Sequence, residues 1–309
     1  MTTNDGVPIN LGLPLMEAGK QAGITISSNA TPTDKFIEVN GLRLHYLDWG
    51  GEGKPWMVCL HGGSQNAHMW DFTALAFSAQ FHIIALDQRG HGDSDWAPDG
   101  NYTASAHQRD ISGFISALKI DSFIMVGLSM GGHNSFRFTS TNPALVRGLV
   151  IVDIGPESSK QGGQRIRNFV TQDDVLDSFD AFVERTKLYD PNRPEWQIRG
   201  SLRHALRQLP DGRWTWKYDK VLRDPDRRSA PDPDRNPEIL WGLWERIQCP
   251  TLLIRGGDSD ILDKGIAEEM EKRLPSCSLV EIEKAGHRVP GDNPIAFEEA
   301  MREFLTQFS

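Results

Sequence analysis

Short apolar runs alternate with amphipathic stretches along most of this chain. Runs such as Trp56–Leu60 and His82–Leu86 are almost entirely apolar, which is typical of strands buried on both faces of a sheet. Stretches such as Ala104–Leu118 and Pro294–Phe308 instead place apolar residues at helical spacing. This alternation predicts an α/β fold, with a mostly parallel, doubly wound sheet covered by helices on both faces. The other predicted strands are residues 36–39, 42–46, 123–126, 148–152, 251–254 and 279–282.

Residues 155–236 have a different character. They are rich in Arg, Asp, Pro and Trp, and they contain no run that would make a buried parallel strand. We interpret them as an inserted, mainly helical cap over the carboxyl edge of the sheet, with the Pro-rich residues 229–237 as its exit linker. The core would then consist of residues 34–154 and residues 237–309.

Within this cap, one hairpin is predicted around Pro210-Asp211-Gly212. Trp214, Trp216 and Tyr218 follow the turn in alternation, so their side chains would share one face of a strand. Trp214 and Trp216 are candidates for the lining of an apolar or aromatic substrate pocket. The alternative is that they hold the cap together or attach it to the core.

The first residues of the chain are predicted to be a flexible extension, residues 1–33. No basic residue precedes Lys20, and Pro8 and Pro14 interrupt the apolar part. The segment therefore does not have the pattern of a signal peptide. We expect it to lie over the core.

Composition narrows the range of partners. A formal net charge of −9 and a pI near 5.5 argue against nucleic acid or an anionic membrane surface. No apolar stretch approaches the roughly 20 residues of a membrane span. The three cysteines are widely scattered, as expected for free thiols in a reducing compartment, so we expect a cytoplasmic protein. Because neither C-x-x-C nor H-E-x-x-H occurs, we expect no metal site and no cofactor.

The motif with the clearest chemical meaning is Gly127-Leu128-Ser129-Met130-Gly131, which directly follows an apolar run. A strand that enters G-x-S-x-G and leaves as a helix is a nucleophile elbow. The turn is so tight that a Cβ at Gly127 or Gly131 would collide with neighbouring backbone. It would expose the Ser129 hydroxyl and place the Met130 N–H at a helix N-terminus, where an oxyanion is stabilised.

A serine nucleophile needs a base, and the base needs an acid to orient it. His287, in Ala285-Gly286-His287, follows the last predicted strand and is the predicted base. Three aspartates could serve as the acid. We favour Asp260, because it lies further beyond the end of its strand and a loop could bring it to His287. Asp153, at the end of the 148–152 strand, and Asp258 are the alternatives.

Two further loops follow strands and carry glycines. In His61-Gly62-Gly63-Ser64 the backbone can bend inward, so the Gly63 N–H is the predicted second oxyanion donor, while His61 would brace the loop. In the loop that begins at Asp87, we expect Asp87 and Arg89 to hold loops together through an ion pair. His133, just after the elbow, either contacts the substrate pocket or only forms part of its helix.

Taken together, these motifs resemble the α/β-hydrolase superfamily from about residue 35 to residue 308, apart from the cap. The elbow, the His-Gly-Gly loop, the Asp-Gln-Arg-Gly-His-Gly-Asp-Ser segment and the late Ala-Gly-His occur in the family's order. The resemblance implies the α/β-hydrolase fold, and its Arg-Gly-x-x-Ser-Asp acid loop commonly uses the final aspartate, which supports Asp260. Members with the acid after the sixth strand keep Asp153 open. Serine at the elbow disfavours epoxide hydrolases and haloalkane dehalogenases, which carry aspartate there.

The predicted function is that of a cofactor-independent serine hydrolase. It would cleave a carboxylic ester of a small or medium, largely apolar molecule through an acyl-enzyme on Ser129, as a monomer or a homodimer. A carbon–carbon bond hydrolase of the meta-cleavage type, or a lactone hydrolase, would use the same triad. A cofactor-free oxygenase, a perhydrolase and a non-enzymatic ligand receptor are further alternatives on this fold.

Overall fold

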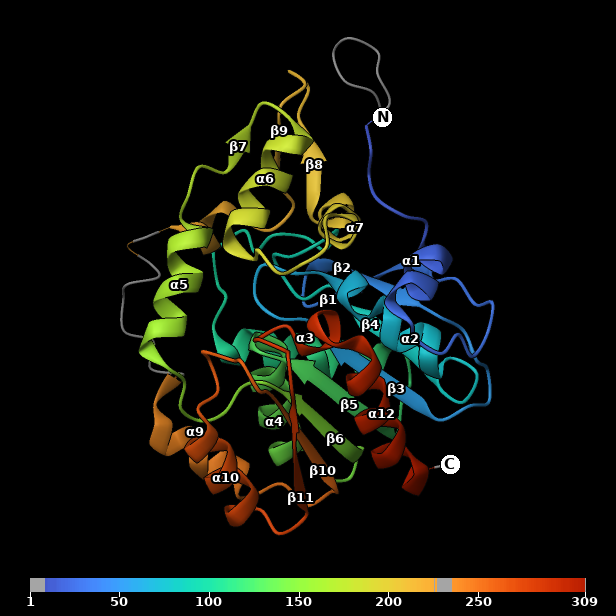
Figure 1. Ribbon diagram of the computed structural model, residues 1–309. Coiled ribbons are helices and arrows are strands. Elements are labelled where there is room, and N and C mark those ends of the chain that lie inside the picture. Colours follow the sequence, from blue (N-terminus) through green and yellow to red (C-terminus); the bar gives the residue numbers. More distant parts are fainter. Residues whose placement is uncertain (1–8, 225, 227–234, 309) are drawn as a thin grey trace.

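In the computed structural model, which describes residues 9–224, 226 and 235–308, a mixed sheet forms the centre of the molecule (Figure 1). Its strand order is β1-β2-β4-β3-β5-β6-β10-β11. β2 runs antiparallel to both β1 and β4, and the remaining pairs are parallel. The predicted mostly parallel sheet is therefore confirmed. The strands are β1 (Thr33–Val39), β2 (Leu42–Asp48), β3 (Trp56–Leu60), β4 (His82–Leu86), β5 (Phe123–Leu128), β6 (Val146–Val152), β10 (Thr251–Gly256) and β11 (Cys277–Ile282).

Helices cover both faces of this sheet because each central strand directs alternate apolar side chains to opposite faces. In β5, Phe123 and Met125 belong to one hydrophobic cluster, and Ile124 and Val126 belong to the other. The first cluster packs under α3 (Ala104–Ala117), α4 (Met130–Thr141), α9 (Pro237–Trp244) and α10 (Lys264–Arg273). The second packs under α1 (Leu15–Ala22), α2 (Asp71–Phe77) and α12 (Pro294–Leu305).

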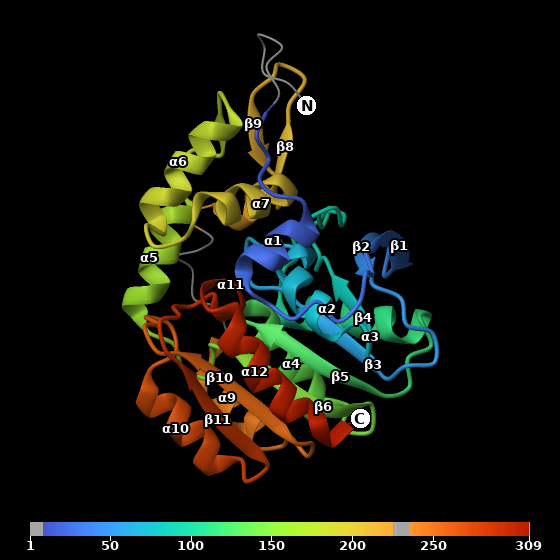
Figure 2. The same ribbon diagram turned by 45° about the vertical axis from the view of Figure 1, so that its right-hand side comes forward.

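The cap leaves the core after β6 and returns at α9, and it lies above the carboxyl edge of the sheet in both views (Figures 1 and 2). It is not only helical: a small antiparallel sheet, β7-β9-β8, contains the predicted hairpin. Part of the predicted exit linker, residues 229–234, lies outside the described residues. The cap elements are α5 (Lys160–Val170), β7 (Val175–Leu176), α6 (Phe179–Tyr189), α7 (Glu195–Ala205), β8 (Leu206–Gln208), β9 (Trp214–Trp216) and the 3₁₀ helix η2 (Lys220–Arg223).

The described part of the N-terminal extension, residues 9–32, is packed against the rest of the protein. α1 lies beside α2 (Figure 2), where Gly19 is buried against Leu75. Before this helix, the carbonyl oxygen of Asn10 accepts a hydrogen bond of 2.9 Å from Arg199 of α7. These residues contact both cap and core, as expected of an extension that lies over the core; residues 1–8 lie outside the described residues.

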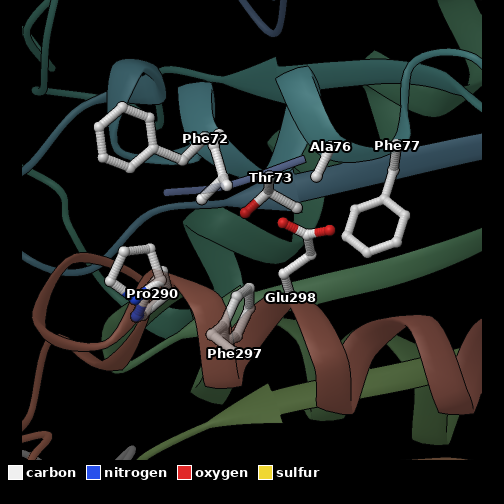
Figure 3. A pocket seen from close by; sticks show the side chains of 9 residues that line it. Phe72, Thr73, Ala76, Phe77, Pro290, Phe297 and Glu298 are labelled. Atoms are coloured by element: carbon white, nitrogen blue, oxygen red, sulfur yellow. The ribbon is translucent and has the colours of Figure 1, made fainter. Parts of the chain in front are cut away.

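A small cavity lies between α2 and α12. Figure 3 shows Phe77 from α2 and Phe297 and Glu298 from α12 around it. Its volume of about 10 Å³ has room for about one water molecule. Glu298 is tied into the packing, since its carboxylate accepts a 2.8 Å hydrogen bond from the Thr25 N–H. The cavity is thus a feature of helix packing, and its lining comes from Ile24, α2, α12 and the short helix α11 (Val289–Asp292).

Among the described residues, no helix combines the length and the apolar character needed to cross a bilayer.

Candidate active site

Ser129 lies in a strained turn between β5 and α4. Its backbone angles are φ 53° and ψ −117°, a conformation that a non-glycine residue adopts only where the surrounding structure imposes it. A Cβ at Gly127 would overlap Gly131, and a Cβ at Gly131 would overlap the Leu60 carbonyl of β3. The glycines therefore permit the close approach of strand, turn and helix that the elbow motif predicts.

The imidazole of His287 is held by Asp153. Its Nδ1 atom lies 2.8 Å from Oδ2 of Asp153, whose side chain is fully buried, while 11 % of the His287 side chain is exposed. The second carboxylate oxygen, Oδ1, accepts a 3.0 Å hydrogen bond from the Gly256 N–H. The Ser259 hydroxyl also donates a short hydrogen bond to Oδ2. Asp153 is therefore a fixed acceptor that orients the His287 ring.

Asp260, the acid favoured from the sequence, does not hold His287. Its Oδ2 atom lies 2.9 Å from Nε of Arg165, in the cap helix α5, and Oδ1 accepts from Nη2 of the same guanidinium. The expectation for the acid is thus corrected: the structure pairs His287 with Asp153, the alternative at the end of β6. The backbone N–H of Asp258 donates to the carbonyl of Ala285 in the loop that carries His287.

The path of the loop that carries His287 (the histidine loop) explains why this side chain meets Asp153 and not Asp260. A Cβ added at Gly256, the last residue of β10, would overlap the carbonyls of Ala285 and Gly286, so this loop crosses directly above the end of β10. β6 is the next strand beyond β10, and the N–H of Asp153 donates 2.7 Å to Ile254. The Ser129 N–H in turn donates to the carbonyl of Val152, the residue before Asp153. The serine turn and the aspartate therefore stand at adjacent strand ends.

The Gly-Gly loop after β3 lies beside the elbow. A Cβ at Gly62 would lie 3.3 Å from Cβ of Ser129, and one at Gly63 would lie 3.9 Å from Cβ of Met130. His61 is fully buried: Nδ1 donates to the carbonyl of Gly62 at 2.7 Å, and Nε2 accepts from the Gln88 N–H at 3.0 Å. Burial lowers the pKa of His61, so the ring is neutral and braces the loop as predicted.

The predicted ion pair between Asp87 and Arg89 does not form. Asp87 contacts His45 instead, with 2.7 Å between Oδ2 and Nδ1. Arg89 makes a bidentate pair with Asp110 of α3, with distances of 2.6 and 2.8 Å. Both pairs are buried. The loop after β4 is therefore held by two separate side-chain pairs, and each reaches a different neighbouring element.

The remaining candidate pocket residues are held inside the structure. Trp214 and Trp216 are 3 % and 7 % exposed, and they pack edge-on against Phe179 and Phe182 in the hydrophobic cluster of the cap. This placement favours the alternative that they hold the cap together. His133 donates from Nε2 to the carbonyl of Gly155 at 2.9 Å, and burial lowers its pKa to about 3.

Comparison with known proteins agrees with this architecture. The model of the alpha/beta hydrolase family matches residues 57–300, which is most of the chain. The chain therefore belongs to the alpha/beta hydrolase family.

Two relatives match most of the chain. The chain is 29 % identical over 298 residues to esterase Rv0045c of Mycobacterium tuberculosis. This match covers 94 % of each protein. A crystal structure of that esterase superposes with a TM-score of 0.77 and covers 94 % of this chain and 96 % of the other. A second relative, the 3-hydroxybutyrate-oligomer hydrolase of Cupriavidus necator, is 27 % identical. That match covers 79 % of this chain and 87 % of the hydrolase.

Proposed function

We propose that this protein is a serine hydrolase that cleaves carboxylic esters through an acyl-enzyme on Ser129. The observation that carries the proposal is the arrangement at the carboxyl edge of the sheet: a strained serine elbow follows β5, and at the end of the adjacent strand β6 a buried carboxylate is bound to the Nδ1 atom of His287. The similarity to esterase Rv0045c supports ester as the bond class.

In the proposed mechanism, the hydrogen bond to Asp153 fixes the tautomer of His287. Because Nδ1–H donates to the carboxylate, the lone pair is left on Nε2, which accepts the proton of Ser129 Oγ as this oxygen attacks the ester carbonyl. Asp153 then stabilises the imidazolium without taking the proton. The protonated Nε2 next donates to the departing alcohol, and water, activated by the same nitrogen, hydrolyses the acyl-enzyme.

The oxyanion of the tetrahedral intermediate would be bound by two backbone N–H groups. Met130 is the first residue of α4, so its N–H lies at the positive end of the helix dipole. Gly63 faces Met130 from the loop after β3. Preorganised donors of this kind each contribute roughly 10²–10³ in rate.

The test is hydrolysis of p-nitrophenyl esters from acetate to octanoate by the wild type and by Ser129→Ala. We expect the variant to lose about 10⁶-fold in kcat while retaining the wild-type melting temperature. Labelling by a serine-directed sulfonyl fluoride, read by intact mass, should modify the wild type and not the variant. Turnover that survives in Ser129→Ala would contradict the mechanism.

The same experiment separates the alternatives. A folded wild type that is labelled at Ser129 but hydrolyses none of the esters would favour a carbon–carbon bond or lactone hydrolase with the same triad. A wild type that is neither labelled nor active would favour a ligand receptor.

A further inference from the structure

We propose that His68, Asp71 and His204 form a binding site for a divalent transition-metal ion, with Zn²⁺ as the representative ion, at the contact between cap and core. One nitrogen from each imidazole and one oxygen of Asp71 lie within 4.8 Å of one another. Two imidazoles and a carboxylate are a donor set that suits Zn²⁺, Co²⁺ and Ni²⁺.

Local structure in the core brings the first two groups together. His68 belongs to the 3₁₀ helix η1 (Ala67–Trp70), and Asp71 begins α2 directly after it. At this spacing the two side chains share one face, with 3.0 Å between Nδ1 of His68 and Oδ2 of Asp71. This short separation is one that two ligands of a single ion can have, once the proton between them has left.

The third group comes from the cap. His204 lies in the last turn of α7, and its ring stacks on that of His68 with 3.4 Å between centroids and 23° between planes. His204 is half-buried at this contact. Its Nε2 accepts a 3.2 Å hydrogen bond from Arg203. An ion would replace that donor, and the two rings would rotate out of their stack to face it.

Asp71 also carries an unsatisfied atom. Oδ1 of Asp71 is buried and has no hydrogen-bond partner among the described residues. A buried carboxylate oxygen without a donor is costly, and a bound cation would satisfy it. The charges around the site are mixed: Asp34, Asp71 and Asp87 act on His68, while Arg203 and Lys217 act on His204.

The second His–Asp cluster provides a contrast. In the group of His45, Asp87 and Asp93, both oxygens of Asp87 are satisfied, by His45, by the Asp93 N–H and by the Ala67 N–H. Asp93 pairs with Lys217. No orphaned oxygen therefore favours an ion there, among the residues that the structure describes.

The test uses the metal-free full chain and does not depend on catalysis. Zn²⁺ is titrated calorimetrically, and Co²⁺ is followed by its visible absorption. We expect one ion per chain, with an affinity at least about tenfold weaker in His204→Gln and in Asp71→Asn. Zn²⁺ should also raise the melting temperature of the wild type and not that of His204→Gln.

The matched control is His82→Gln. His82 also contacts an aspartate, Asp48, at 2.7 Å, but no second histidine belongs to that pair, so this variant should keep wild-type affinity. If His204→Gln unfolds, the Zn²⁺ affinity of the near-isosteric variant Asp71→Asn provides the test. Wild-type affinity in the folded ligand variants, loss of binding in His287→Gln instead, or a wild-type Kd above about 1 mM would each overturn the proposal.

Discussion

The carboxylate of Asp260 is bound to the guanidinium of Arg165 in the cap, 2.9 Å between Oδ2 and Nε, and so joins the loop after β10 to α5. The backbone approaches equally closely, since a Cβ at Gly162 of α5 would overlap the Asp260 carbonyl. The aspartate that follows β10 therefore contacts the cap, and the histidine is oriented by Asp153 after β6.

The two aspartates should consequently differ in their effect on turnover. We expect Asp153→Asn to lower kcat by about 10⁴-fold, because the amide would favour the wrong tautomer of His287. Asp260→Asn is the matched control, and its kcat should remain within about threefold of the wild type because its ion pair is partly exposed. Steady-state kinetics on one p-nitrophenyl ester compare them, and the reverse ranking would return the acid to Asp260.

Substitution of glycine by alanine should distinguish a position where the fold requires glycine from a position where it tolerates a larger residue. Gly131→Ala places a Cβ against the Leu60 carbonyl, so we expect loss of several kcal/mol of stability or of soluble protein. In α9, a Cβ at Gly242 meets nothing within 4 Å, so Gly242→Ala should stabilise the protein by about 0.5–1 kcal/mol. Urea unfolding measures both, and a Gly131→Ala protein of wild-type stability would contradict the elbow packing.

Buried charge pairs should contribute more to the free energy of unfolding than exposed ones. The side chains of Arg89 and Asp110 are 7 % and 4 % exposed, so Arg89→Ala leaves a buried, unpaired carboxylate and should cost about 3–5 kcal/mol. Arg165→Ala breaks an exposed pair and should cost less than about 1 kcal/mol. The comparison is made by chemical unfolding at low and high salt. Equal effects of the two substitutions would refute the ranking.

Acid should destabilise this protein through its buried histidines. Burial lowers the pKa of His107 to about 3, well below its value of about 6.5 in an unfolded chain. Between these values only the unfolded state binds the proton. The contribution of His107 to the free energy of unfolding is therefore fully present above about pH 6.5, and it is lost as the pH decreases toward about 3. The slope is about 1.4 kcal/mol per pH unit for each such group.

His107→Gln removes one of these groups. If the variant folds, its free energy of unfolding should depend less steeply on pH in this window than that of the wild type. Parallel pH profiles from urea unfolding would show that His107 is not the cause.

The sequence predicted those features that depend on local patterns. Each predicted strand appears, because a buried strand between helices is recognisable from its own residues; the last helix ends at Leu305 and continues as a 3₁₀ turn, Thr306–Phe308. Ser129 and His287 could be proposed from the sequence because each lies in a short motif at a strand end. The hairpin at Trp214 was found from its turn residues, whereas β7, with two residues, has too little pattern to be predicted.

The acid could not be chosen from the sequence because the choice depends on how two distant loops cross. Asp153 and Asp260 both follow strands, and only the passage of Gly286 over Gly256 determines which carboxylate meets His287. The cluster of His68 and His204 was missed for the same reason. C-x-x-C and H-E-x-x-H motifs join ligands that are close in sequence, whereas His204 reaches His68 only through the docking of the cap.

The N-terminal segment changes how the cap can move. Two covalent connections alone would let the cap swing as a lid about one axis. Asn10 and Leu13 also accept hydrogen bonds from Arg199 and Arg203 of α7, and the helix that follows them is packed on α2. This noncovalent strap fixes a third point, so an opening movement that lifts α7 must first detach it. The two ends of the cap are therefore held differently: the α7 end by this strap, and the α5 end by the contacts of Arg165 and Gly162 with Asp260.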